Sequence, residues 1–310
     1  MEIKKIIFTF KSWYITPLES DTILGYIFAM NFNTLKDVFD DFQKWESPFL
    51  ITNAFEDGYL PRPSYFTNNE QLLPTLEKDI KDEKDRKKLK KSLWLPLDKK
   101  ALELCFLNKN KQQQNEFKKY LISNENNDKE ENKKVSEFKN NIPRFHKWET
   151  NPYTIENVKW DKRSFIIYVK ILDEDKWNKF YASMKTIFTT IWWGKWKSRW
   201  YGKIDKIEVE TLTTEEKEVF DYIEEMKNNG RYYILNNYKP SNEELKVINL
   251  EESFIEYNHK NGKTLQNMPF KWQFSFIKAG SVVQSDNKLI WDKYVFENEN
   301  NKSVNFGYLF

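Results

Sequence analysis

A short segment between residues 192 and 203 combines the two kinds of side chain that proteins use to hold single-stranded nucleic acid. It contains four of the 12 tryptophans and two of the eight glycines of the chain, interleaved with lysine and arginine. Cations neutralise phosphates, aromatic rings stack on bases, and glycine lets the backbone approach a nucleic acid closely. The alternative is that these tryptophans pack between two domains or subunits, and we expect some of each.

A second segment of cations and aromatic rings lies near residue 145. Its members are Arg144, Phe145, His146, Lys147 and Trp148. Prolines on either side favour extended backbone, so we expect Asn141–Tyr153 to form a projecting β-hairpin or extended arm with a cationic face. For His146 we weigh three roles: a general acid in RNA cleavage, a stacking or phosphate contact with RNA, and plain surface exposure.

No other residues are spaced as a catalytic or metal-binding set. One cysteine, Cys105, excludes a disulfide framework and a cysteine-based zinc site, and its place in an apolar segment predicts a buried thiol. The second histidine, His259, lies in a polar turn and is expected to be exposed. Neither of the glycine-rich phosphate-binding motifs occurs, so we expect no cofactor and no metal.

Composition limits the class of protein. The chain has 310 residues, about twice the usual domain size, so we expect two domains or one with large insertions. Its aromatic content of 17% argues against disorder. The longest apolar stretch, 23–32, is far shorter than the roughly 20 residues that span a bilayer. This excludes a membrane protein and, with the single cysteine, favours a cytoplasmic one.

The charge of the chain is nearly balanced. The formal net charge is only +3, because 50 lysine and arginine residues face 47 acidic residues. Such a balance fits a surface that is used mostly for protein partners, with only a groove that needs to be basic.

The first half of the chain must supply elements that position the two basic segments. Alternating apolar residues predict a strand over residues 2–14, and Ser20 or Asp21 can cap the helix that follows. The next elements that we expect are a helix with Leu35, Val38, Phe39 and Phe42 on one face, a strand at 48–51 and an extended exit at 60–63.

Residues 67–140 differ in composition, and we interpret them as an insertion. It is expected to contain a solvated helix at 76–91, a short apolar element near 102–107 and a polar loop. Residues 78–91 hold eight basic and four acidic residues. We interpret this run as a solvated helix face, with a nucleic-acid patch as the alternative.

The second half repeats the succession of strands and helices. We expect strands at 164–172, 204–212, 232–235, 270–278 and 289–296, a helix at 176–191, and a helix that Thr213 or Thr214 caps and Gly230 ends. This order predicts an α+β protein with two domains, 1–155 and 156–310, each with an antiparallel sheet.

Four short stretches of the chain follow the pattern of one known family. They are 16–25 (TPLESDTILG), 47–55 (SPFLITNAF) with 59–63 (YLPRP), 141–144 (NIPR) and 194–203 (GKWKSRWYGK). Together they resemble the RAMP superfamily of CRISPR proteins. Specifically, they resemble the subunit that caps the 5′ handle of the guide RNA in type III-A, Csm-type effector complexes.

The resemblance implies an α+β fold of two ferredoxin-like, RRM-type domains. The 67–140 insertion would belong to the first domain, as would the projecting arm, and the basic aromatic loop at 192–203 would belong to the second. The resemblance also implies a non-catalytic subunit of an antiviral ribonucleoprotein. Such a subunit binds the 5′ handle of the guide CRISPR RNA, docks on the large polymerase-like subunit and begins the filament of backbone RAMP subunits.

The candidate RNA-binding residues come from these stretches, from the expected arm and from the end of the opening strand. They are Lys11, Ser20, Thr22, Arg62, Arg144, His146, Lys147, Trp148, Lys195, Trp196, Lys197, Ser198, Arg199, Trp200 and Lys203. Asp21 also lies in the SDT motif, where we expect it to cap the first helix rather than to contact RNA or a neighbour.

Two other functions compete with this one. The chain could be an endoribonuclease of the same superfamily that processes guide-RNA precursors, with His146 as acid or base. It could also be a protein-interaction scaffold with no RNA contact. Cleavage of repeat RNA by the purified chain would favour the first alternative, and a complex that gives no ultraviolet crosslink to guide RNA would favour the second.

Overall fold

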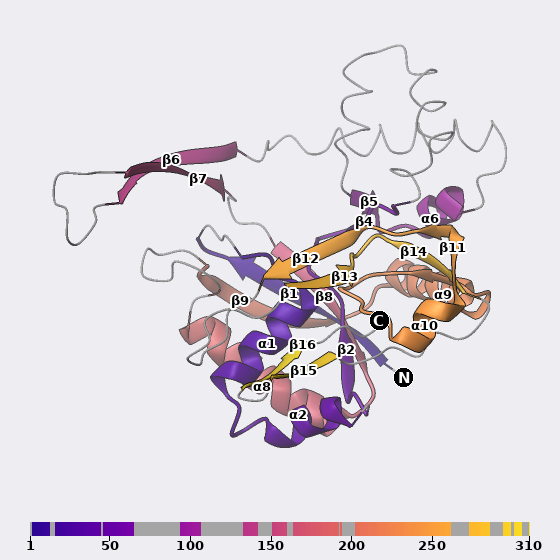
Figure 1. Cartoon of the computed structure of the whole chain (residues 1–310), viewed down its shortest axis with the longest axis horizontal. Helices are drawn as coiled ribbons and strands as arrows, with labels where there is room; N and C mark the ends of the chain where they lie inside the picture. The colour runs from indigo at the N-terminus through magenta and orange to yellow at the C-terminus, as the bar shows by residue number, and fades with distance from the viewer. Residues whose placement is uncertain are drawn as a thin grey trace, which may run out of the picture.

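The structure is a computed structural model. It describes residues 2–12, 16–44, 46–64, 94–106, 133–141, 151–159, 164–191, 193, 202–261, 273–285, 294–298, 301–305 and 310. Figure 1 shows the arrangement of the strands and helices in these ranges.

The largest sheet has five strands and is built around the first strand of the chain. Its strand order is β2-β8-β1-β9, and β3 also pairs with β8. The strands are β1 (Glu2–Phe10), β2 (Phe49–Ile51), β3 (Phe55–Glu56), β8 (Ser164–Ile171) and β9 (Ile204–Thr211). Every pairing among them is antiparallel. Residues from both halves of the chain therefore form one sheet.

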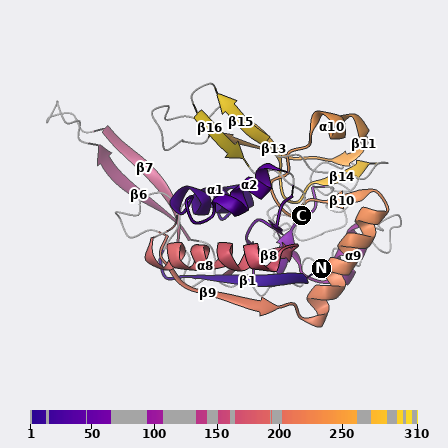
Figure 2. The same ribbon diagram turned by 90° about the horizontal axis from the view of Figure 1, so that it is seen from below.

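Three helices cover one face of this sheet. They are α1 (Ser20–Met30), α2 (Lys36–Gln43) and α8 (Glu174–Thr190), and Figure 2 shows them on the same side of β1 and β9. The succession β1-α1-β2-β8-α8-β9 is the βαββαβ order of ferredoxin-like folds. Alternate residues of β1 point toward these helices, so Phe8 is fully buried and its ring lies 5.7 Å from that of Phe188.

On the opposite face of the sheet, the helix α9 (Thr214–Asn228) packs against one part of β1 and β8. The ring of Tyr168 on β8 lies 4.7 Å from that of Phe220 on α9, in an edge-on contact. On the same face, the Lys5 Nζ lies 3.1 Å from a Glu216 carboxylate oxygen, which also accepts a hydrogen bond from the Tyr168 hydroxyl at 3.2 Å. A buried ionic contact thus ties β1 to the first turn of α9.

A smaller sheet follows α9. Its strand order is β10-β14-β11, from β10 (Arg231–Tyr233), β14 (Val282–Ser285) and β11 (Ile248–Phe254). The neighbouring elements are the helix α10 (Asn242–Val247) and the antiparallel pair β12 (Tyr257–Asn261) and β13 (Gln273–Ile277). These elements share a second apolar cluster that includes Tyr232, Tyr238 and Val283.

The remaining elements are short or lie at the edges. They are β4 (Tyr59–Pro61), β5 (Trp94–Pro96), α6 (Lys99–Phe106), β6 (Lys133–Asn141), β7 (Asn151–Lys159), β15 (Tyr294–Asn298) and β16 (Asn301–Asn305). The helix α6 contacts α9. The strands β4 and β5 pair with each other, as do β15 and β16.

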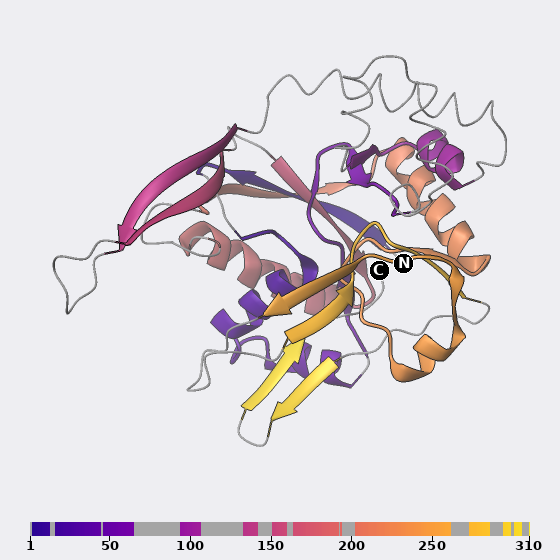
Figure 3. The ribbon, with the colours of Figure 1, turned by 45° about the horizontal axis from the view of Figure 1, so that its top comes forward.

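The pair β6 and β7 overlaps the segment in which we expect a projecting arm. The two strands are antiparallel from the Lys133–Lys159 pair to the Asn141–Asn151 pair, and they lie at the edge of the molecule in Figure 3. The middle of the expected arm, 142–150, is outside the described residues. The arm therefore stays a prediction.

Most of the expected elements are confirmed, with small changes of bounds. The opening strand ends at Phe10, and the expected apolar element near 102–107 is the helix α6. The helix α9 begins at a capping box of Thr213 and Glu216, and Gly230, with φ +76°, follows its end. The helix α10 is an addition to the expected elements, and Ser241 and Glu244 form a second capping box at its start. The expected helix at 76–91 lies outside the described residues.

One capping prediction is wrong. The helix α1 begins after Glu19, whose side chain does not cap it, and neither Ser20 nor Asp21 is the N-cap residue. Ser20 and Asp21 lie inside its first turn, where their side chains have partners in other parts of the chain.

The expected division between residues 155 and 156 falls within β7. Since β8 and β9 pair with β1, the sheet joins strands from both of the expected domains. A second ferredoxin-like domain stays a prediction. Within the described residues, no helix is both long enough and apolar enough to cross a bilayer.

The Lys5–Glu216 pair is expected to be important for stability. Burial by itself would lower the pKa of Lys5, but the hydrogen bond to Glu216 and the charges of Asp57 and Glu216 raise that pKa above its ordinary value. Lys5 is therefore charged at neutral pH. The stability that its pairing with Glu216 contributes is lost only when the pH rises through the raised pKa of Lys5. Glu216→Gln should lower the free energy of unfolding by roughly 3 kcal/mol, because it leaves a buried charge with a weaker partner.

Urea denaturation at pH 7 measures this loss. The control is Glu174→Gln, which breaks the exposed 2.8 Å pair with Lys4 and should cost about 0–1 kcal/mol. Equal losses in the two variants would contradict the prediction.

Cys105 is expected to be unreactive in the folded chain. Its thiol is buried, and burial raises its pKa well above the ordinary value, opposed only in part by the charge of Arg62. Since the thiolate is the reactive form, an aromatic disulfide reagent at pH 8 should leave the native chain unlabelled. The reagent should label one thiol in urea. Rapid labelling of the native chain would contradict this prediction.

Candidate nucleic-acid interface

Trp193, near the start of the basic aromatic segment, is hydrogen-bonded to Gly202, near its end. We call this pair of residues the loop base. The Trp193 N–H donates to the Gly202 carbonyl at 2.7 Å. Gly202 has φ +77°, and a Cβ built on it would lie 1.9 Å from the Trp193 carbonyl oxygen. Only glycine therefore fits at this point. The geometry of the loop base thus explains why one of the two glycines of the segment is a glycine.

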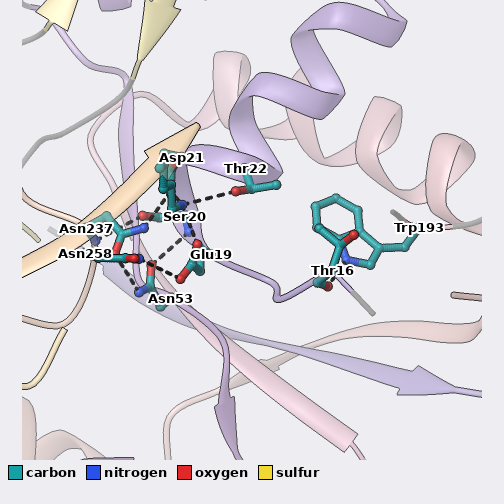
Figure 4. A network of polar contacts seen from close by, with 10 residues as sticks. Thr16, Glu19, Ser20, Asp21, Thr22, Asn53, Trp193, Asn237 and Asn258 are labelled. Carbon is teal, nitrogen blue, oxygen red and sulfur yellow. Dashed lines mark hydrogen bonds and ion pairs between the residues drawn. The ribbon is translucent and has the colours of Figure 1, made fainter. Parts of the chain in front are cut away.

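Trp193 fixes the loop base to the helices. Its side chain is 1% exposed, and its ring lies 5.2 Å from the rings of Tyr26 on α1 and Phe188 on α8. The indole N–H donates to the Thr16 carbonyl at 2.6 Å, a contact between two residues that Figure 4 shows. The ring of this tryptophan thus packs within the main apolar cluster of the chain and not in an interface between two domains.

Two of the candidate cations meet beside the loop base. The Lys11 N–H donates to the Lys203 carbonyl at 2.9 Å, and the Lys203 N–H donates to the Ser12 hydroxyl at 2.7 Å. The two lysines come together because β1 and β9 are neighbours. The Lys11 side chain is 62% exposed, and its ammonium lies 3.8 Å from an exposed carboxylate oxygen of Asp205. Such a contact is weak in water, so Lys11 can exchange it for a phosphate.

Most of the other candidate residues cannot be placed. Arg144, His146, Lys147 and Trp148, and all candidates from Lys195 to Trp200, lie outside the described residues. Arg62 follows β4 and is half-buried, and its carbonyl oxygen would lie 2.7 Å from a Cβ at Gly280, just before β14. The RNA contacts of all these residues remain sequence-based predictions.

Ser20 and Thr22 lie in a second cluster, which we call the polar junction. It joins the start of α1 to Asn53 after β2, to Asn237 after β10 and to β12 (Figure 4). The Ser20 N–H donates to the Asn53 side-chain oxygen at 2.9 Å, and the Asn53 amide donates to the Asn237 side-chain oxygen at 3.4 Å. Ser20 itself is 1% exposed, so in this structure it holds elements together and is not accessible to RNA.

Asp21 is the charged centre of the polar junction. Its carboxylate accepts hydrogen bonds from the Asn237 amide at 2.7 Å and from the Lys260 ammonium at 2.6 Å. Lys260 also pairs with Glu19 and lies 3.3 Å from the Thr22 hydroxyl. The capping role that we expected for Asp21 is wrong because its carboxylate faces β12 instead of the backbone N–H groups of its own helix.

The sequence analysis missed the partners of Glu19 and Asp21. Asn237, Asn258 and Lys260 lie more than 200 residues from the SDT motif, and the Asn258 amide donates to Glu19 at 3.1 Å across a separation of 239 residues. No local spacing identifies such partners. Asn53 could have been found, since it lies in the family-like stretch 47–55.

The arrangement offers cations and hydrogen-bond donors rather than reactive groups. Within the described residues, no three or more histidine, cysteine, aspartate or glutamate side chains could hold a metal ion. His259 is exposed, as expected, but it lies on the strand β12 and not in a turn, and its Nδ1 lies 2.8 Å from the Ser275 hydroxyl.

Comparisons with known proteins agree with this fold. No protein-family model and no curated protein matches the chain, but solved structures do. The chain is similar to one in a Csm3-Csm4 subcomplex of a type III-A CRISPR-Cas interference complex, with a TM-score of 0.58 and 15% identity. The match covers 99% of this chain and 98% of that chain.

Two further structures are Csm1-Csm4 cassettes, one in complex with AMPPNP and the other with cA4. Each matches with a TM-score of 0.52, at 14% and 15% identity respectively, over 99% of this chain and 96% of that chain. Csm4 is the subunit common to all three structures. The RAMP-type fold that the sequence predicts is thereby confirmed, and the chain has the fold of the Csm4 subunit.

Proposed function

We propose that this chain is a non-catalytic subunit of a type III CRISPR effector complex that binds the 5′ handle of the guide RNA. The observation that carries the proposal is the match to a Csm4-type chain over 99% of this chain and 98% of that one. Two chains that shared only one domain would match over only part of their lengths. A match over nearly the whole length of both chains favours the same position for this chain in a complex of the same kind.

The partners follow from the same comparison. The matching structures contain Csm4 together with Csm3 in one case and with Csm1 in the others. We assign to this chain the corresponding partners, a backbone RAMP subunit and the large polymerase-like subunit. The nearly balanced charge, +3 in total, supports a surface that mostly meets proteins.

The loop base supports the RNA-binding part of the proposal. It holds Lys11 and Lys203 side by side, at one end of a segment whose further candidate cations and aromatic rings lie within 195–200. The tight turn at Gly202 and the buried Trp193 hold the two ends of this segment in place. Because the loop base is already ordered before RNA binds, less conformational entropy is lost on binding.

One purification tests the whole proposal. A tagged full-length chain is purified from its own cells, and the RNA and proteins that travel with it are identified. We expect guide RNAs with a common 5′ end, a polymerase-like subunit and a backbone RAMP subunit. Recovery of both proteins without RNA would overturn the RNA-binding role and favour the scaffold.

The cations at the loop base should contribute to RNA binding by neutralising phosphates. In the purified complex, Lys11→Ala/Lys203→Ala should weaken guide retention and reduce the slope of log affinity against log salt. The slope should fall by roughly 0.7 for each phosphate that a lysine neutralises in the parent, because fewer counterions are released on binding. Lys197→Ala/Arg199→Ala should act in the same way. The measurement is guide release over a salt series.

Lys179→Ala is the matched control, because Lys179 is an exposed lysine of α8 that pairs with Asp37 at 2.7 Å. It should leave the salt slope unchanged. Parent-like slopes in both double variants would mean that this surface does not meet RNA.

His146 separates the proposed function from an endoribonuclease. His146→Ala should leave any nuclease activity of the assembled complex intact and loosen the guide slightly, since RNA binding requires no proton transfer from this side chain. Cleavage of precursor and target RNA is measured in a complex whose subunit composition is verified. Abolished cleavage with correct assembly would make this chain the nuclease.

A further inference from the structure

The segment from Thr16 to Thr22 connects the loop base to the polar junction. At its first residue, the Thr16 carbonyl accepts the indole N–H of Trp193 at 2.6 Å. At its other end, Asp21 accepts from Lys260 at 2.6 Å. The two contacts belong to different parts of the fold, because Trp193 follows α8 and Lys260 lies on β12.

The segment is short and held along its length. Pro17 restricts the backbone, and Leu18 is buried and accepts a backbone hydrogen bond from Ala54 at 2.8 Å. The Ile23 N–H donates to the Glu19 carbonyl at 2.8 Å, which begins the helix. The segment between Thr16 and Asp21 is thus fixed by Pro17, by the Leu18 contact and by the first turn of α1.

The helix α1 provides a second connection. Tyr26, one turn and a half after Asp21, packs edge-on against the Trp193 ring with 5.2 Å between ring centroids. A shift of α1 along or around its axis would thus act on Trp193 both through its indole N–H and through its ring.

Lys260 is the charged group that fixes the start of α1. Its side chain is 20% exposed, whereas those of Asp21 and Glu19, with which it pairs, are 10% and 24% exposed. Its ammonium also lies 5.8 Å from the centre of the Phe276 ring, a cation–π contact. The cluster holds two carboxylates and one ammonium. Without Lys260, the two carboxylates would repel each other at the same helix end.

We propose that Lys260 is a positioning residue for the loop base. Through Asp21 and the first turn of α1 it holds Thr16 and Tyr26 where Trp193 can bind them, and so keeps Lys11 and Lys203 together. The coupling between Lys260 and Trp193 stands on the structure alone. Its consequence for RNA rests on the proposed function.

Hydrogen–deuterium exchange of the full-length chain without RNA tests the coupling. Lys260→Met removes the charge at similar length, and Asp21→Asn keeps an acceptor for Asn237 while it removes the carboxylate. Either variant should exchange roughly five-fold faster in the peptide that contains Trp193, because the local opening that frees its N–H becomes easier. Exchange at the centre of β1 should stay as in the parent.

Two further variants make the test specific. Lys260→Arg keeps the charge and should restore parent-like exchange at Trp193. Lys278→Met is the control, since Lys278 follows β13 and pairs at 3.1 Å with Glu256, which is outside the polar junction. It should not change exchange at Trp193.

The outcomes separate the coupling from the proposed function. Unchanged exchange at Trp193 in both Lys260→Met and Asp21→Asn would overturn the coupling, and so would an equal acceleration throughout β1, which signals only a loss of global stability. If exchange responds as expected, the Lys260→Met complex should release its guide at lower salt than the parent. A guide held as tightly as in the parent would then overturn the RNA role of the loop base, while the coupling stands.

Discussion

The pairing of β1 on both of its edges is the constraint on which the rest of the structure depends. This strand, at the beginning of the chain, is hydrogen-bonded to β8 on one side and to β9 on the other, and both come from the second half. Closing such long loops costs conformational entropy. The cost is offset by burial on both faces, with Phe8 against α8 on one face and the Lys5–Glu216 contact to α9 on the other.

The position of the candidate interface follows from that pairing. Because β1 and β9 are antiparallel neighbours, the end of one meets the beginning of the other, and Lys11 and Lys203 become adjacent. Trp193 then ties the same place to α1 and α8. The basic segment is therefore attached to a well-packed part of the molecule. A binding group on a rigid base loses less entropy when it meets its ligand.

The parts of the fold that the sequence predicts are those that depend on neighbouring residues. The alternation in β1, the helix cap at Thr213 or Thr214 and the stop at Gly230 are local signals, and all three are confirmed, with Thr213 as the cap. The role of Asp21 could not be predicted in this way. Its residue type suits a helix cap equally well, and only the folded chain brings Lys260 to it. The sharing of one sheet by both halves is likewise a property of strand pairing, which composition does not reveal.

The aromatic content of the chain shows why residue type alone leaves two interpretations open. Within the described residues, the ten largest fully buried side chains are all aromatic, so much of the 17% belongs to the core. A tryptophan that stacks on a base needs an accessible ring face, and Trp193 has its ring against Tyr26 and Phe188 and its N–H on Thr16. The core thus extends to the loop base.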